Sequence, residues 1–192
     1  MGRMIPVKFR TPSTIKPEEI HKMLDVVESR ILPLTEEFVR KGHNLFGGAV
    51  LDPVTLEPVV VGSNRRSDNP VFHGEVETLL RFYQLKDRPK AEDLVFLATH
   101  EPCCMCFSAL AWCGFKEAWY LFDYTETDKD FNMPDDLIML RELFGSQDIR
   151  RNNSYLNLYS IKEAAKLSSD AEAIMARIEA LKSKYKALPV VL

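Results

Sequence analysis

Three cysteines fall within four positions of the stretch HEPCCMC, which runs from His100 to Cys106. Pro102 pre-sets the first turn of a helix here, so Cys103 and Cys106, three residues apart, present their sulfurs on one side. The positive end of the helix dipole lowers the pKa of a thiol and favours the thiolate form that binds zinc. Taken alone, the stretch is compatible with a redox pair, a structural metal site, half of a catalytic metal site, or buried small apolar residues.

All four cysteines of the chain lie within residues 103–113. A disulfide framework spreads its cysteines along the chain in order to close loops, so this clustering favours metal or redox chemistry. A closed structural zinc site needs four protein ligands, whereas a catalytic site needs three and a water molecule. The chain contains no second Cys-x-x-Cys motif, so any further ligand has to be of another type.

The useful partner is the tripeptide His73-Gly74-Glu75. His73 could hold zinc together with Cys103 and Cys106, and Glu75 could reach a metal-bound water without binding the metal itself. Such a site keeps its fourth position open for water, as catalytic zinc sites do. This interpretation requires that the starts of two different helices lie side by side.

Hydrophobic periodicity, acidic helix starts and glycine stops predict the elements that could achieve this. The predicted strands are 47–52, 58–63, 94–100, 117–123 and 155–160, of which the first two form a hairpin. The predicted helices are 17–42, kinked or divided at Pro33, then 74–85, 103–113, 134–145 and 169–187. This order indicates an α/β sandwich with helices on both sheet faces, in which helices 74–85 and 103–113 start at the same edge.

The motif His-x-Glu, followed thirty residues later by Pro-Cys-x-x-Cys, resembles the signature of the zinc nucleobase deaminases. On this motif the chain is identified as a member of the cytidine/deoxycytidylate deaminase superfamily, with a resemblance that covers roughly residues 35–125. HGEVETL and PCCMC look most like fungal cytosine deaminases, and EPCCMC is also similar to guanine deaminases and tRNA adenosine deaminases. The resemblance implies a three-layer α/β/α sandwich around a mixed five-stranded sheet.

The resemblance also implies a mechanism. Zn²⁺ would be held by His73, Cys103 and Cys106, and it would lower the pKa of a bound water toward neutrality. Glu75 would carry protons from this water to a ring nitrogen and then to the departing ammonia.

Three more residues are expected to contact the substrate. Asn64 corresponds to an asparagine that hydrogen-bonds the base in the family, and Phe46 to an apolar residue next to the base. The backbone N–H of Cys104, at the open start of its helix, is expected to hold the developing oxyanion.

The predicted function is zinc-dependent hydrolytic deamination of a free nucleobase or related amino-heterocycle, of the cytosine or guanine type, in nucleobase metabolism. The alternatives are a tRNA adenosine deaminase and a non-catalytic zinc-binding module with the same fold. The net charge of −3 and the lack of a basic run disfavour a nucleic-acid partner. Retention of Glu75 disfavours the module, because a purely structural site needs no proton shuttle.

The chain is interpreted as one deaminase-like domain over residues 1–192. Residues 126–192 are expected to form a C-terminal extension that packs on the core and closes the pocket. The lack of a long apolar run and of a signal-peptide pattern predicts a cytoplasmic protein that does not associate with membranes. Because superfamily members are typically dimers or larger, with the catalytic helices near the interface, a homo-oligomer is expected, most simply a homodimer.

Four other side chains have ordinary structural interpretations. His100 ends a predicted strand and is expected to be structural rather than a metal ligand. Trp112 and Trp119 are expected in the core. Glu77 is expected to be solvated, because on a helix it faces away from Glu75.

Overall fold

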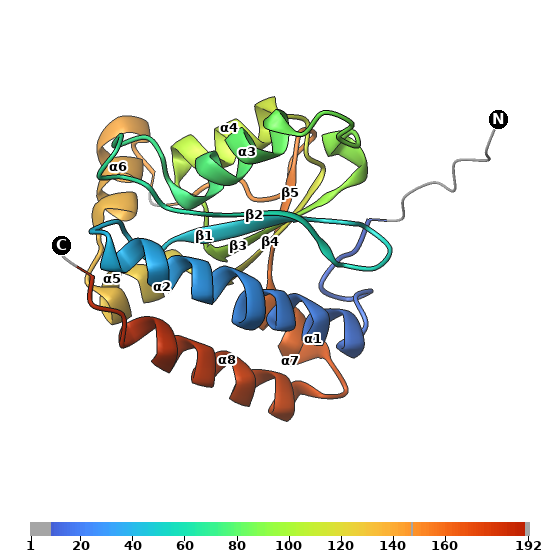
Figure 1. The fold of residues 1–192 in the computed structure, drawn as a ribbon. Helices are drawn as coiled ribbons and strands as arrows, with labels where there is room; N and C mark the ends of the chain where they lie inside the picture. The colour runs from blue at the N-terminus through green and yellow to red at the C-terminus, as the bar shows by residue number, and fades with distance from the viewer. Residues whose placement is uncertain (1–8, 147, 191–192) are drawn as a thin grey trace.

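The computed structural model describes residues 9–146 and 148–190, and its centre is a mixed five-stranded sheet (Figure 1). The strands lie in the order β2-β1-β3-β4-β5. Each of the five predicted strands is present, with the bounds β1 Gly47–Leu51, β2 Pro58–Ser63, β3 Val95–His100, β4 Glu117–Phe122 and β5 Asn157–Ser160.

The pairing of the strands brings several chain segments to one edge of the sheet. β1 pairs antiparallel with both β2 and β3, whereas β3, β4 and β5 pair in parallel. β1 and β2 form the expected hairpin, in which Gly47 lies opposite Ser63. Because β1 is antiparallel to both of its neighbours, β2 and β3 run in the same direction and end at the same edge. The residues just after β2 and β3 therefore meet those just before β1.

Helices cover both faces of this sheet and confirm the three-layer α/β/α sandwich. In Figure 1, α3 and α4 lie on one face and α1, α2, α7 and α8 on the other, with α5 and α6 beside one end of the sheet. The bounds are α1 Pro17–Val26, α2 Leu32–Arg40, α3 Gly74–Gln84, α4 Cys104–Trp112, α5 Tyr124–Phe131, α6 Asp135–Phe144, α7 Ile161–Leu167 and α8 Ala171–Lys186.

Two hydrophobic cores explain why the central strands read as continuous apolar runs. Leu97 and Trp119 face the core under α1, α2, α7 and α8. Their neighbours Phe96, Ala98 and Tyr120 point the other way, into the core under α3 and α4. Successive side chains of a strand alternate between the faces, so a strand that is buried on both faces is apolar throughout.

The first predicted helix is divided before Pro33, as expected, but by a single wide turn. Residues Val27–Ile31 form a π-helical turn between α1 and α2, in which the N–H of Leu32 donates to the carbonyl of Val27. Proline has no N–H to donate, and its ring would clash with the carbonyl four residues earlier, that of Ser29. The π turn removes that conflict while the chain continues in a helical path.

Two helices were not predicted from the sequence, α5 and α7. Both begin at a side chain that accepts a hydrogen bond from a backbone N–H three residues later: Asp123 from Glu126 at 2.9 Å, and Ser160 from Glu163 at 3.3 Å. Each pair fits the capping pattern in which Ser, Thr or Asp precedes a glutamate by three residues. That pattern was the available signal, and it is weaker than the apolar periodicity used for the longer helices.

Two side-chain expectations were wrong. Trp112 is 90% exposed, whereas Trp119 is fully buried as expected. Glu77 is buried rather than solvated, because its carboxylate pairs with Arg81 at 2.9 Å and Arg65 at 3.4 Å.

Within residues 9–146 and 148–190, none of the helices combines the length and apolar character required to cross a membrane.

Candidate active site

The starts of α3 and α4 lie at the sheet edge where β2 and β3 end. His73 is the residue immediately before α3, and Cys103 is the residue immediately before α4; both have extended backbones. Cys106 follows one turn into α4. Unpaired N–H groups and the positive dipole end of each helix face this region, which favours anionic sulfur.

The three predicted metal ligands are brought together. The donor atoms of His73, Cys103 and Cys106 all lie within 4.8 Å of one another. Cys103 Sγ is 3.6 Å from His73 Nδ1. Zn–S bonds are about 2.3 Å long and Zn–N bonds about 2.0 Å, so a sulfur and a nitrogen on a tetrahedral zinc lie about 3.5 Å apart. The spacing and the mixed sulfur and nitrogen donors therefore fit zinc, with three protein ligands and one open position.

The electrostatics of the group favour a thiolate at Cys103. A hydrogen bond from Cys106 and a further bond to His73 lower the pKa of Cys103 to about 4, against the opposing effect of burial. The hydrogen bond to Cys103 raises the pKa of His73 to about 9. Burial raises the pKa of Cys106, which is fully buried, so this thiol depends on a cation to lose its proton. A coordinated metal supplies that charge.

Glu75 lies beside these donors as the second residue of α3. It is only 4% exposed. Burial, together with the negative charge of Cys103, raises the pKa of Glu75 to about 7. A carboxyl group with a pKa near the working pH can both take up and release a proton, as general acid–base catalysis requires.

Gly74 separates His73 from Glu75 for a steric reason. A Cβ at this position would lie 2.5 Å from the carbonyl oxygen of Phe46. Only glycine lets the start of α3 approach the chain this closely where it enters β1. The Phe46 ring is stacked over His73, with ring centroids 6.4 Å apart at an angle of 13°. Phe46 thus lies against a candidate ligand, on the side from which β1 starts.

Asn64 follows β2 at the same edge and is almost fully buried. Its side-chain oxygen accepts hydrogen bonds from the backbone N–H groups of Arg66 at 2.9 Å and Asn44 at 3.2 Å. These two donors fix which end of the amide is the oxygen. The NH₂ group is the end left to donate to a ligand.

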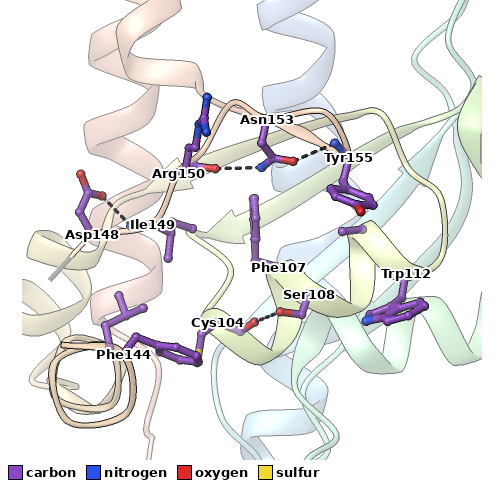
Figure 2. Close-up of a pocket in the computed structure, with 12 residues that line it drawn as sticks. Cys104, Phe107, Ser108, Trp112, Phe144, Asp148, Ile149, Arg150, Asn153 and Tyr155 are labelled. Carbon is purple, nitrogen blue, oxygen red and sulfur yellow. Dashed lines mark hydrogen bonds between the residues drawn. The ribbon is translucent and has the colours of Figure 1, made fainter. Parts of the chain in front are cut away.

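Cys104 is the first residue of α4, and its backbone N–H and its side chain lie in different environments. Its backbone N–H is one of the donors that a helix start leaves unpaired. Its side chain instead lines a cavity of about 760 Å³ on the outer side of α4. Figure 2 shows this residue with its carbonyl accepting a hydrogen bond from Ser108.

Sequence reasoning missed Asp136, the second residue of α6. Its side chain is half-buried, and its carboxylate has no hydrogen-bond or ion-pair partner among the residues that the structure describes. Burial and the negative charges of Cys103 and Glu75 raise the pKa of Asp136 to about 7, so its carboxylate lies within electrostatic range of these groups. The sequence shows only an acidic pair at a helix start, which the helix dipole already explains. No local motif distinguishes Asp136 from its neighbour.

His100 stays outside the donor group, in agreement with its structural interpretation. It is buried among the rings of Phe46, Phe122, Phe131 and Tyr185. Burial lowers the pKa of His100 to about 3, so the ring is neutral. It fills the aromatic core beneath the site.

Comparison with known proteins identifies this region. Residues 29–122 match the family described as the cytidine and deoxycytidylate deaminase zinc-binding region. Residues 29–122 therefore carry the zinc-binding region of this deaminase family. Zinc is thus its cofactor, and His73, Cys103 and Cys106 form the group that could hold it.

Solved structures support the deaminase fold at low sequence identity. Guanine deaminase from Bacillus subtilis is 19% identical with a TM-score of 0.50, over 71% of this chain and 98% of that one. A tRNA deaminase of the wobble position is 16% identical with a TM-score of 0.50, over 74% and 98%. A third structure, in complex with 2,6-diaminopurine, is 14% identical with a TM-score of 0.51, over 96% and 87%. No curated protein sequence matches the chain.

Two cysteines in the first turn of α4, Cys104 and Cys106, provide a matched pair of variants for the metal group. Cys106→Ser should lower the zinc content from about one ion per chain to near zero, because only two of three ligands remain. Cys104→Ser should keep its zinc, because that side chain lines the outer cavity. Elemental analysis of dialysed proteins measures both. Equal zinc content in the two variants would contradict the assignment.

Proposed function

We propose that the protein is a zinc-dependent hydrolytic deaminase of a free nucleobase or related amino-heterocycle, of the cytosine or guanine type, and that it releases ammonia. One observation carries this proposal. Glu75, a buried carboxyl with a pKa raised to about 7, lies beside the three-donor group of His73, Cys103 and Cys106. A purely structural zinc site would have no use for a carboxyl in this position.

The proposed mechanism assigns the proton transfers to Glu75. His73, Cys103 and Cys106 would hold zinc, which would act as a Lewis acid and lower the pKa of water toward neutrality. Glu75 accepts a proton from the attacking water and delivers it to a ring nitrogen. The same carboxyl then takes the second proton of that water from the oxygen now bonded to carbon and passes it to the amino group. The carbon–nitrogen bond breaks as the carbonyl forms, and ammonia departs. The unpaired backbone N–H of Cys104 stabilises the oxygen that gains charge during the attack.

Three side chains are proposed to orient the base. The NH₂ group of Asn64 donates to a carbonyl or ring nitrogen of the substrate, because its oxygen is already occupied by backbone donors. Phe46 covers one side of the site. The Asp136 carboxylate, without a described partner of its own, accepts from ring or amino N–H groups. An amino-heterocycle has both the hydrogen-bond acceptor that Asn64 needs and the N–H donors that Asp136 needs.

Two alternative functions have less support from the sequence and the site. A tRNA adenosine deaminase shares the fold and the motif, but the net charge of −3 and the lack of a basic run disfavour a polyanionic substrate. A non-catalytic zinc module would leave Glu75 without a role. Both alternatives are tested by the same experiment.

That experiment measures ammonia release from cytosine, guanine, adenine, their nucleosides, amino-triazines and a tRNA, with Glu75→Gln beside the wild type. We expect one free base or amino-heterocycle to be turned over, and the variant to lose about 10²–10⁴-fold in rate while it retains zinc. Turnover of the tRNA alone would favour the first alternative. If a zinc-loaded protein released no ammonia from any compound tested, the result would favour the non-catalytic module.

The adjacent acids of α6 allow a sharp test of substrate recognition. Asp136→Asn should lower kcat/KM for the substrate about 10- to 100-fold, because a charged hydrogen-bond acceptor is lost at a half-buried position. Asp135→Asn, on the exposed side of the same helical turn, should change kcat/KM less than twofold. Steady-state kinetics at matched zinc content measure the difference. Indistinguishable kinetics for the two variants would remove Asp136 from the site.

We further propose that the chain forms a homo-oligomer, in the simplest case a homodimer, through the outer face of α4. No charged residue occurs between Pro102 and Phe115, so α4 is apolar on every side, and such helices are normally buried. Yet its outer face bears the exposed Trp112 and the cavity of about 760 Å³. Figure 2 shows Phe107 of α4, Phe144 of α6 and Tyr155 around this cavity. A second copy of the same apolar surface would cover it.

Light scattering tests this interface. The wild type should have about twice the monomer mass of 22.0 kDa, and Trp112→Ser should shift the mass toward the monomer because it removes an exposed indole from the contact. Val54→Ser, which removes another exposed apolar side chain from the turn between β1 and β2, should leave the mass unchanged. A monomeric wild type would contradict the proposal.

A further inference from the structure

An ion pair between a fully buried carboxylate and a partly exposed arginine lies next to the candidate zinc ligands. The Glu101 side chain has no exposed surface, and it stands at the end of β3, two residues before Cys103. Arg151 Nε donates to one of its oxygens at 2.6 Å. The backbone N–H of Tyr124 donates to the other oxygen at 3.3 Å. A buried carboxylate is tolerated only when it has partners of this kind.

The same neighbours also hold the backbone that leads into Cys103. The Glu101 N–H donates to the carbonyl of Phe122 at 2.7 Å. The Tyr124 hydroxyl donates to the carbonyl of Pro102 at 2.5 Å. Both residues that precede Cys103 are therefore fixed by groups outside α4, from the junction of β4 with α5 and from Arg151.

Arg151 belongs to the C-terminal part of the chain, between α6 and β5, and is itself anchored. Its carbonyl accepts a hydrogen bond from the N–H of Leu158 on β5 at 2.9 Å. Its guanidinium also pairs with Asp148 at 2.5 Å. Arg151 thus connects the β5 edge of the sheet to the segment that carries a candidate metal ligand.

We propose that the Glu101–Arg151 pair positions Cys103 for zinc, so that the C-terminal part of the chain controls how tightly the metal is held. The proposal rests on the zinc site of the proposed function. Without Arg151, the Glu101 carboxylate is left buried without its cation and turns toward water. The two residues that follow move with it, and Cys103 Sγ leaves the position that a tetrahedral site demands. Groups that orient metal ligands commonly change metal affinity 10- to 100-fold when they are lost.

The test measures zinc release from the full chain to a chromophoric chelator, at a temperature where every variant is folded. Arg151→Met should release zinc about tenfold faster than the wild type or more. Arg150→Met is the matched control, because that neighbouring side chain is exposed and makes no ion pair with a described residue. It should release zinc at the wild-type rate. Arg151→Lys, which keeps the charge but not the planar donor, should fall between them and replaces Arg151→Met if that variant does not fold.

A double variant separates positioning from simple stability. Glu101→Gln combined with Arg151→Met removes the unpaired buried charge, so the melting temperature should recover toward that of the wild type. Zinc release should stay fast, because the connection to the β5 edge is still missing. Recovery of slow release together with the melting temperature would overturn the proposal, as would a wild-type release rate in Arg151→Met.

These outcomes are independent of turnover. A wild type that binds zinc but deaminates no substrate would defeat the proposed function and leave the positioning role standing. A wild type that takes up no zinc would defeat both. Normal turnover with unchanged release in Arg151→Met would defeat only the positioning role.

Discussion

The contact between Cys103 and His73 joins two helix starts that lie thirty residues apart in the chain. It depends on the strand order: because β1 is antiparallel to both β2 and β3, these two strands end at one edge and deliver α3 and α4 side by side. Gly74 permits the required close approach at Phe46. The sandwich, with a core on each face of the sheet, serves to hold these two helix starts in register.

Charge is the second constraint on this region. Four acidic groups surround a single imidazole: Cys103, Cys106 and Glu75, which are buried, and Asp136, which is half-buried. The raised pKa values of Glu75 and Asp136, both near 7, express the mutual repulsion of these groups and their desolvation. A divalent cation relieves this kind of imbalance, since it stabilises two thiolates as ligands and offsets the negative charge around Glu75. The site is therefore organised around a positive charge that the protein itself does not supply.

The sequence predicted the sheet, most of the helices and the donor group, because local patterns mark them: apolar runs for strands, and short motifs at helix starts for His73, Cys103 and Cys106. Features that depend on distant parts of the chain could not be predicted in this way. Asp136 and Arg151 carry no motif, and only the folded chain brings them to residues 73–103. Trp112 was misplaced because an apolar residue in an apolar helix predicts burial. The pattern does not distinguish burial within the chain from burial against another molecule. Glu77 was misplaced because its two arginine partners are invisible in the helical pattern.

The aromatic core beneath the site has a consequence for the order of synthesis. Phe46, His100 and Phe122 belong to the first two thirds of the chain, yet Tyr185 of α8 completes their packing from close to its end. At typical elongation rates of roughly 5–20 residues per second, the ribosome makes the metal donors several seconds before this last ring. During that interval the thiols of the nascent chain lack the complete aromatic packing beneath them. For most of it they also lack the guanidinium of Arg151. The packing around the metal donors is thus complete only after α8 has been made and has docked.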